Sequence, residues 1–428
     1  MNIHPSKTLL SISLIVICTW LVAQNPKMRN EMRLRDPFYL DTMSVDFQNI
    51  LHLWNDYKDS VYDDYMASRG DDRATGSQKA MTFWEESEIQ KYGNPSLFQG
   101  NPDLFLCTFQ LHPTNYYMGK EFFIGVEKRN DTLFELRTMF FVDYPTENQL
   151  AGVFTLPIIK HSEEDYKFYT KLSLIKPQLQ SFQIGWLTYY YPPEYDFNEK
   201  AAKQTFEVAD SIATILQIKQ PDGIEYYIFE NKTEYYRSLG VDVSPFDFIG
   251  CSKIYPQGLS MNNGKRLFYT KDGETLAHEL IHSLIREKGQ KHTVFEEGVC
   301  SYYGGHALEP KEVTLSNLKL WLNENPQINL SSNLFKAYKD EGGRFVSDSI
   351  LAYTKEEFNY GDFTNNYYYA IQMVICEMAH NKGGIQLVFE MLFDLKNDNE
   401  EYDIITKHLG IKKKDTDRTI RDYLNYYY

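Results

Sequence analysis

The chain contains few cysteines, no apolar run long enough to cross a membrane and no large basic cluster. It has 5 Cys in 428 residues, and that count forces no disulfide. The longest apolar stretch, near the N-terminus, covers about 15 residues, whereas a membrane-spanning helix needs about 20. The formal net charge is −15, and the largest basic run is Lys412-Lys413-Lys414. This charge argues against nucleic acid or an anionic membrane as a partner.

Two common catalytic motifs are also missing. The chain has no Gly-rich phosphate loop and no G-x-S-x-G nucleophile elbow, and it contains no internal repeat. Tyrosine, by contrast, is abundant, because 33 Tyr bring the aromatic share to 15%. We interpret the recurring Tyr pairs as half-buried faces of sheets and helices whose hydroxyls stay in water. A surface that stacks on carbohydrate or binds peptides is the alternative.

The first 23 residues predict a cleaved secretory signal peptide. Lys7 precedes an apolar run at 9–17, and the small residue Ala23 stands before a polar restart at Gln24. An uncleaved anchor is the alternative, whereas lipidation of Cys18 is disfavoured because no small residues precede it. We expect a secreted, periplasmic or cell-surface protein with no membrane span after cleavage. The mature chain then keeps four cysteines, which we expect to be buried free thiols: Cys107, Cys251, Cys300 and Cys376.

Residues 24–192 predict an α+β domain built on an antiparallel sheet. Apolar residues at helical spacing predict helices at 41–57 and 79–92. A hairpin turn is expected at 129–131. Segments rich in aromatic and β-branched residues predict strands at 104–111, 121–127, 132–142, 166–174 and 180–190. We find no catalytic constellation in this domain.

Pro192-Pro193 separates this domain from residues 193–428, which predict a mostly helical domain with a small mixed sheet. Asp272 or Thr275 is expected to cap the helix that begins after the turn at 271–273. Strands are expected at 224–229, 251–255 and 265–270. Helices are expected at 202–216, 233–239, 275–285, 314–323, 332–340, 366–380, 385–395, 401–409 and 415–425.

An H-E-x-x-H motif organises this second domain. His278 and His282 are four residues apart, so their side chains point the same way on a helix. Each can place an imidazole nitrogen about 2.0–2.1 Å from one zinc ion. Glu279 is offset around the helix, where it can hold a metal-bound water. The alternative is that both histidines are satisfied by ordinary hydrogen bonds in a buried helix.

A zinc site that hydrolyses substrates normally has three protein ligands and one position for water. Two histidines leave one ligand to find. The downstream segment Phe295-Glu296-Glu297-Gly298 offers two adjacent candidates. The residues alone leave Glu296 and Glu297 both open.

The segment from His278 through Gly298 resembles the gluzincin zinc metallopeptidases (the peptidase MA-like group). In that group H-E-x-x-H is followed by a helix that opens with Glu-Gly. The resemblance makes Glu297 the third ligand, with Glu296 as the alternative, and implies one Zn²⁺ per chain and a thermolysin-like fold. The order of elements is similar over roughly residues 180–425. This chain departs from the family at Cys300, which stands where the family has a small residue.

The resemblance implies a secreted zinc peptidase that acts on peptide or protein substrates. Bound zinc would activate a water molecule, and Glu279 would act first as general base and then as general acid. The developing oxyanion needs a further donor, for which Tyr369 is our candidate. The alternatives are Tyr368, Tyr303 and His306. The strand at 265–270 either pairs with substrate as an added strand or is an ordinary edge strand.

Two other hypotheses compete with this one. The first is a zinc-containing binding or scaffold protein with little or no turnover. Glu279 argues against it, because a structural zinc site needs no such carboxylate. The second is a metallohydrolase of a non-peptide amide or ester, which the metal site alone does not separate from a peptidase. The expected organisation is a signal peptide at 1–23, an α+β domain at 24–192 and a gluzincin-like domain at 193–428.

Overall fold

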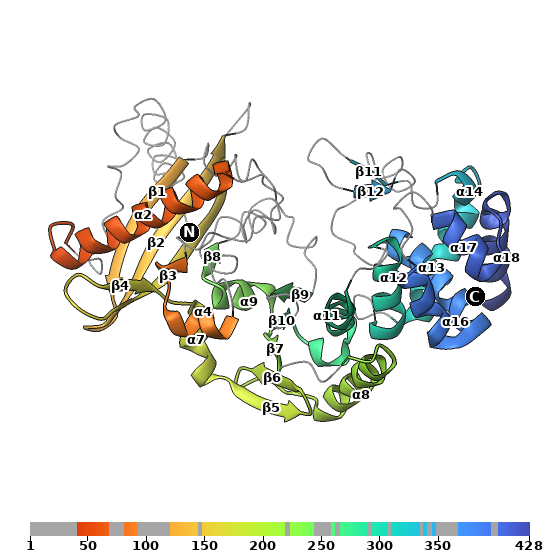
Figure 1. The fold of residues 1–428 in the computed structure, drawn as a ribbon, viewed down its shortest axis with the longest axis horizontal. Helices are drawn as coiled ribbons and strands as arrows, with labels where there is room; N and C mark the ends of the chain where they lie inside the picture. Colours follow the sequence, from red (N-terminus) through yellow and green to blue (C-terminus); the bar gives the residue numbers. More distant parts are fainter. Residues whose placement is uncertain are drawn as a thin grey trace, which may run out of the picture. The chain divides into compact units, whose positions relative to one another are not determined.

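A computed structural model of the chain contains two compact units (Figure 1). Unit 1 comprises Met1–Pro177 and Tyr236–Phe248, and unit 2 comprises Gln178–Tyr235 and Ile249–Tyr428. The structure describes residues 41–67, 81–92, 120–143, 148–218, 223–243, 258–261, 266–289, 293–305, 310–333, 337–339, 345–347, 367–394 and 401–428. The signal peptide predicted at 1–23 and the strand predicted at 104–111 lie outside these ranges.

Unit 1 is built on an antiparallel sheet, as the sequence predicts. Its strands run in the order β1 (Lys120–Lys128), β2 (Leu133–Asp143), β3 (Asn148–Lys160) and β4 (Tyr166–Phe168). A further short strand, β8 (Val241–Val243), also pairs with β3. The predicted turn between β1 and β2 is confirmed, because the side-chain oxygen of Asn130 accepts the Leu133 N–H at 2.8 Å.

Helix α2 (Val45–Ala67) lies across this sheet in Figure 1. Its residues Phe47, Ile50, Trp54 and Tyr57 recur at three and four and are at most 1% exposed. The rings of Trp54 and Tyr57 contact Phe168 of β4 at centroid distances of 6.1 and 5.1 Å. Burial of each such side chain contributes about 1.5–3 kcal/mol, so this aromatic face attaches the helix to the sheet.

The strand predicted at 166–174 is only partly correct. After β4 the chain turns into the short helix α7 (Lys171–Ile175), because the Thr170 hydroxyl caps it by accepting the Ser173 N–H. Glu88 of helix α4 (Glu86–Tyr92) accepts the Ser173 hydroxyl at 2.7 Å. This capping arrangement, rather than strand propensity, decides the local structure.

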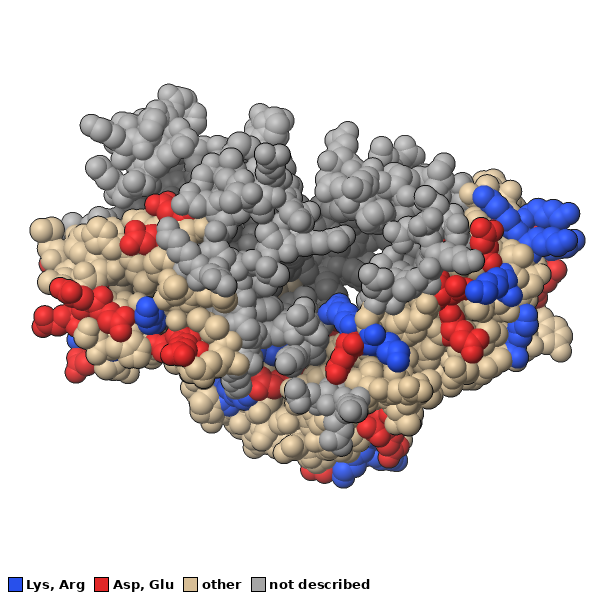
Figure 2. Space-filling model, viewed as in Figure 1, with Lys and Arg blue, Asp and Glu red and all other residues tan. Residues whose placement is uncertain are grey.

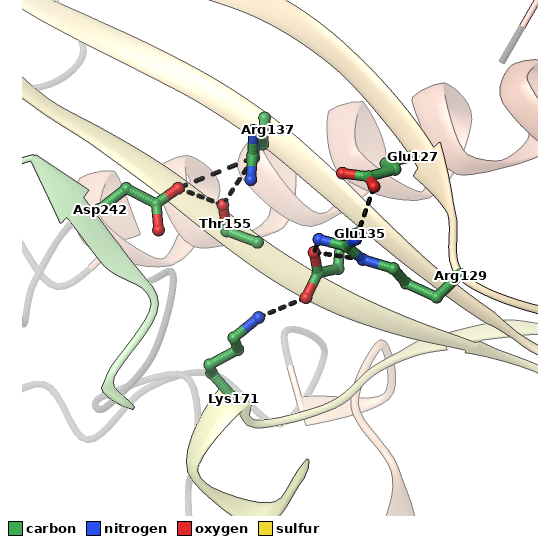
Figure 3. A network of polar contacts seen from close by, with 7 residues as sticks. All are labelled: Glu127, Arg129, Glu135, Arg137, Thr155, Lys171 and Asp242. Atoms are coloured by element: carbon green, nitrogen blue, oxygen red, sulfur yellow. Dashed lines mark hydrogen bonds and ion pairs between the residues drawn. The ribbon is translucent and has the colours of Figure 1, made fainter. Parts of the chain in front are cut away.

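The sheet of unit 1 also carries a network of charged side chains (Figure 3). Glu135 of β2 is 4% exposed and lies between two cations, Arg129 and Lys171. The Arg129 Nε donates to it at 2.8 Å. Next to this group, Arg137 donates to the Thr155 hydroxyl at 3.2 Å. Glu135 is thus a buried carboxylate with two positive partners, the condition under which burial of a charge is tolerated.

Unit 2 contains the small mixed sheet that the sequence predicts. Its order is β5 (Gln180–Ile184), β6 (Leu187–Tyr191), β7 (Ile224–Ile228), β10 (Arg266–Tyr269) and β9 (Gly258–Met261). The β6–β7 and β7–β10 pairs are parallel, and the two outer pairs are antiparallel. Because β6 pairs with β7, the hairpin at 180–191 belongs to unit 2. The unit boundary at Pro177 therefore differs from the one expected at Pro192-Pro193.

The strand expected at 265–270 forms β10, but it is not an edge strand. β10 has β7 on one side and β9 on the other, so both of its backbone edges are already hydrogen-bonded. It is therefore not available to receive a substrate strand, and both interpretations of this segment from the sequence are wrong. The segment predicted as a strand at 251–255 lies outside the described residues.

Most helices of unit 2 follow this sheet in the chain, and those from α12 onward pack against one another (Figure 1). In the described part of the chain these helices are α8 (Glu199–Ile215), α11 (His278–Lys288), α12 (Thr293–Gly304), α13 (Lys311–Glu324), α14 (Leu330–Asn333), α16 (Tyr367–Leu392), α17 (Glu401–Leu409) and α18 (Thr416–Tyr427), and α9 (Lys232–Ser238) crosses the boundary between the units. The predicted break near residue 383 is confirmed as a kink in α16, where Gly384 has a φ of 67°. The helix predicted at 332–340 is wrong at 337–339, since these residues form strand β11 and pair with β12 (Phe345–Ser347).

Several tyrosines of the sheet are more buried than we expected. Tyr189, Tyr226 and Tyr227 are 0% exposed. The Tyr226 hydroxyl lies 2.9 Å from the Leu276 carbonyl oxygen instead of in water. Tyrosine in this sheet therefore connects layers of the structure through backbone carbonyls.

No helix in the described part of the chain is long and apolar enough to span a membrane. Figure 2 shows both acidic and basic side chains among the described residues on one face of the molecule.

Replacing Glu135 by Gln should destabilise unit 1 by about 1–3 kcal/mol at pH 7, because two cations lose their shared anion. Burial acts to raise the pKa of Glu135, but the hydrogen bonds and charges of Lys171 and Arg129 outweigh it and lower that pKa. The stabilisation is therefore present above the unfolded value of about 4.3 and is lost as the pH falls through the folded value. Denaturant unfolding from pH 3 to 7 measures this difference.

Asp131→Asn is the matched control, because Asp131 also pairs with a lysine, Lys128, at 2.8 Å but is 96% exposed. Its free energy of unfolding should match that of the wild type. An equal loss in both variants would contradict the role assigned to burial at Glu135.

Candidate metal centre

The two histidines of the motif lie one turn apart on α11, as the sequence predicts. The helix is buried along Leu280, Ile281, Leu284 and Ile285, and this apolar stripe fixes its rotation against the core. The Nε2 atoms of His278 and His282 consequently lie 3.2 Å apart.

Helix α12 brings the third acidic group to the same place. The Oε2 atom of Glu297 lies 3.2 Å from the His282 Nε2 and 3.3 Å from the His278 Nε2. Within the described residues, these three form the only convergent group of three or more His, Cys, Asp or Glu side chains. The three atoms define a nearly equilateral ligand triangle.

The outer nitrogens of both imidazoles are held by hydrogen-bond acceptors. The His278 Nδ1 lies 3.2 Å from the carbonyl oxygen of Gly305, and the His282 Nδ1 lies 2.6 Å from Glu296 Oε1. Because a carbonyl and a carboxylate only accept, each Nδ1 carries the proton. In the neutral rings each Nε2 therefore presents a lone pair towards the triangle.

The ligand triangle fits zinc. Three acceptors that converge within 3.3 Å repel one another unless a cation or a proton lies between them. Tetrahedral zinc with ligand distances of about 2.0–2.1 Å places its ligand atoms roughly 3.3–3.4 Å apart. The edges of the triangle match that spacing. The donor set of two imidazoles and one carboxylate is one that zinc enzymes use.

The pKa shifts at the centre reflect the same need for positive charge. Burial acts to lower the pKa of His282, but Cys300, Glu296 and Glu297 together raise it well above its ordinary value. Burial acts to raise the pKa of Glu297, and the two imidazoles outweigh it and hold that pKa far below its usual range. A proton and a metal ion thus compete for the same position.

The two glutamates left open by the sequence have different positions. Glu297 contributes the oxygen of the triangle, whereas Glu296 lies on the far side of the His282 ring at Nδ1. A carboxylate at that nitrogen fixes the tautomer and orientation of a ligand histidine. The residues alone could not assign these roles, because they depend on the rotation of α12 against α11; the family resemblance favoured Glu297 as the third ligand.

Glycines allow α12 to approach both of its neighbours. A Cβ atom on Gly298 would lie 2.6 Å from the carbonyl oxygen of Gln372 on α16. A Cβ atom on Gly304 would lie 2.5 Å from the backbone nitrogen of His278 on α11. The Gly304 carbonyl also accepts the Ala277 N–H at 2.9 Å. Packing therefore explains why a glycine follows Glu297 at position 298.

The cap expected for α11 is not found. Ala277 occupies the N-cap position and offers no side-chain hydrogen bond. Thr275 donates its hydroxyl hydrogen to the Asp272 carbonyl at 2.7 Å, and Asp272 itself begins a short 3₁₀ turn before the helix. The backbone N–H of Glu279 instead donates to the hydroxyl of Tyr269 at 3.1 Å. Sequence reasoning missed Tyr269 because it comes from a strand nine positions before the helix begins.

The oxyanion donor stays a prediction. Tyr369 lies half-buried in the first turn of α16, the helix whose Gln372 accepts the Gly298 N–H at 3.1 Å. Tyr368 lies in the same turn. Tyr303 places its hydroxyl 2.8 Å from the His380 Nδ1 and stacks on Phe389. His306 lies outside the described residues.

Two of the four cysteines of the mature chain are described, and both are buried free thiols as expected. These are Cys300 and Cys376. Burial, the largest effect, raises the pKa of Cys300 to about 12, although the nearby His282 acts to lower it. The neutral thiol therefore fills the position where the family pattern has a small residue.

No protein-family model matches the chain, and no curated protein or solved structure matches it either. The resemblance to gluzincins therefore still depends on the motif residues that suggested it. The geometry of the ligand triangle is an independent observation, since it comes from packing.

Gly298→Ala should destabilise the chain by about 1–3 kcal/mol, because the added methyl group overlaps the backbone of α16. Ser301→Ala is the control. Ser301 lies on the same helix, is 1% exposed, and its hydroxyl has no hydrogen-bond partner in the described structure. Removing this hydroxyl should therefore leave the free energy of unfolding unchanged. Denaturation midpoints measure both variants, and equal midpoints would contradict the packing role of Gly298.

Glu296→Gln should weaken zinc binding about 10–100-fold, because the neutral amide supports the His282 tautomer less strongly than a carboxylate. Competition with a coloured chelator measures the Kd. The control is Glu287→Gln, an exposed glutamate of α11, which should bind zinc like the wild type. An unchanged Kd in Glu296→Gln would refute the role of this carboxylate.

Proposed function

We propose that the chain is a zinc-dependent peptidase of the gluzincin type that acts after export. The observation that carries this proposal is the ligand triangle of His278, His282 and Glu297, with edges of 3.2–3.3 Å. A glutamate, Glu279, directly follows the first ligand on the same helix. The mixed sheet followed by helices in unit 2 is compatible with a thermolysin-like fold.

Zinc bound in the triangle would lower the pKa of a water molecule to about 7 and polarise the carbonyl group of a substrate. The work of the chain's own residues is to position these groups and to move a proton. His278, His282 and Glu297 would hold the metal as its protein ligands, so that it could still bind a water molecule.

Glu279 is the proton carrier in this mechanism. Its carboxylate accepts the proton that the attacking water loses, and the same carboxyl group then delivers that proton to the leaving amine. A general base of this kind contributes about 10²–10⁴-fold to the rate. Tyr369 is our candidate for the donor that binds the developing oxyanion.

The intact Glu279 favours an enzyme over a zinc-containing scaffold. A structural zinc site is closed by four protein ligands, whereas three ligand atoms converge here among the described residues. Hydrolysis of a non-peptide amide or ester uses the same residues, so the substrate has to be identified by experiment.

Glu279→Gln should keep about one zinc per chain and lose about 10²–10⁴-fold in hydrolysis, because the amide cannot accept the water proton. Elemental analysis measures the zinc. Digestion of a peptide library, with and without a chelator, followed by mass spectrometry, measures the hydrolysis. Glu287→Gln, an exposed glutamate of the same helix, is the matched control and should cleave like the wild type.

Full hydrolysis in Glu279→Gln would refute the mechanism. Zinc retained by the double variant His278→Ala/His282→Ala would refute the site. A wild-type protein that binds zinc but cleaves no peptide in a chelator-sensitive way is not a peptidase. If that protein hydrolyses simple amides or esters, it is a metallohydrolase of non-peptide substrates. If it hydrolyses none of them, the zinc-containing scaffold hypothesis is supported.

A further inference from the structure

Helix α11 begins without a cap of its own. The first four N–H groups of any helix lack partners inside the helix and must find them elsewhere. Here the N-cap residue is Ala277, whose side chain cannot accept a hydrogen bond. The Gly304 carbonyl accepts the Ala277 N–H at 2.9 Å. The Glu279 N–H, one residue after the first ligand, donates to the Tyr269 hydroxyl at 3.1 Å.

Tyr269 is held so that its hydroxyl cannot move. The residue is 3% exposed, and its ring stacks on Tyr226 with a centroid distance of 5.1 Å and an angle of 4°. Tyr226 in turn contacts Tyr189 at 4.9 Å. The chain also turns at Gly273 against Tyr269, since a Cβ atom on Gly273 would lie 2.3 Å from the Tyr269 Cβ. Packing on these sides restricts the movement of the ring.

The segment that precedes α11, around Glu274, is also held by hydrogen bonds. Glu274 is 1% exposed, and its carboxylate accepts from the Tyr195 hydroxyl at 2.8 Å and from the Asn198 N–H at 3.1 Å. The Thr205 hydroxyl donates to the Glu274 carbonyl at 2.6 Å. These bonds join the segment to the start of α8 and the loop before it. The Tyr269 hydroxyl is therefore a fixed point relative to both the sheet and the helix start.

Burial also keeps the Tyr269 hydroxyl protonated. Burial, the largest effect, raises the pKa of Tyr269 well above its ordinary value, and the charge of Glu279 raises it further. Tyr269 therefore stays a neutral O–H group over the whole range in which a peptidase works.

We propose that Tyr269 is the positioning residue of Glu279: its hydroxyl binds the backbone of the general base and sets where that carboxylate stands beside the ligand triangle. The catalytic role of Tyr269 rests on the proposed function. The hydrogen bond between Tyr269 and the Glu279 N–H does not. A misplacement of about 1 Å at a reacting group can lower a rate about 10²-fold. Loss of one hydrogen bond at the Glu279 backbone can therefore lower the rate of hydrolysis measurably.

Tyr269→Phe tests the proposal, because it removes the hydroxyl and keeps the stacked ring. Zinc content and the Kd for zinc should stay within about two-fold of the wild type, since no ligand is touched. Exchange of the Glu279 amide hydrogen should rise about ten-fold relative to the Leu284 amide in the same helix, which corresponds to the loss of one hydrogen bond. The kcat should fall about 10–100-fold while KM changes less than about two-fold.

Tyr189→Phe is the matched control. Tyr189 contacts the Tyr226 ring of the same stack, is 0% exposed, and places its hydroxyl 3.4 Å from the carbonyl oxygen of Ala202 on α8. Any general loosening of the stack should affect both variants. The ratio of Glu279 to Leu284 exchange and the kcat should both stay at wild-type values in this control.

An unchanged exchange ratio in Tyr269→Phe would overturn the contact, and an unchanged kcat would overturn the positioning role. A kcat that falls equally in Tyr189→Phe would also overturn it, because the effect would then belong to the stack. A wild-type protein without chelator-sensitive hydrolysis would refute the peptidase proposal and with it the catalytic role of Tyr269. The exchange ratio would still decide whether Tyr269 binds Glu279, so the two failures are distinguishable.

Discussion

Three hydrogen-bond acceptors lie within 3.3 Å of one another, and the packing of unit 2 has to hold them there. Such an arrangement is unfavourable unless a cation or a proton lies among the three atoms. The surrounding structure nevertheless enforces it. The Nδ1 atoms of both histidines are held at acceptors, Gly305 on one side and Glu296 on the other, so neither ring can turn its donor inward. The packing thus creates a position that suits a positive charge.

Helix α12 is the element that makes this possible. It contributes Glu297 to the triangle and Glu296 to the outer nitrogen of His282, and the chain just past its end contributes the Gly305 carbonyl. Its position depends on two close approaches, one at Gly298 towards α16 and one at Gly304 towards α11. Because both contacts are between backbones, a larger side chain at either position would move the helix and the carboxylates with it. The geometry of the centre is therefore a consequence of helix packing.

Helix α11, which carries both histidines, is positioned from the sheet. Its start has no side-chain cap, and strand β10 supplies Tyr269 in its place. Tyr269 stacks on Tyr226 of β7, and Tyr189 of β6 contacts Tyr226 at a tilt, so three tyrosine rings lie next to one another below that contact. We expected these tyrosines to be half-buried with their hydroxyls in water. Their hydroxyls are instead buried and connect the sheet to a helix. Unit 1 uses the same residue types differently, since its aromatic residues attach α2 to an antiparallel sheet.

The sequence by itself determined the features that depend on local spacing. Histidines four apart must share a helix face, so the spacing alone pairs His278 with His282. Apolar periodicity likewise predicted α2, α8, α17 and the kink in α16, and the turn at 129–131 followed from its Asn. The tertiary structure decided everything that depends on how elements rotate and pack against one another. It separated Glu297 from Glu296, turned β10 into an inner strand, moved the hairpin at 180–191 into unit 2 and replaced the expected cap by Tyr269. These contacts join residues whose separation in the chain carries no periodic signal, because the closeness of two helices or strands is set by the side chains between them.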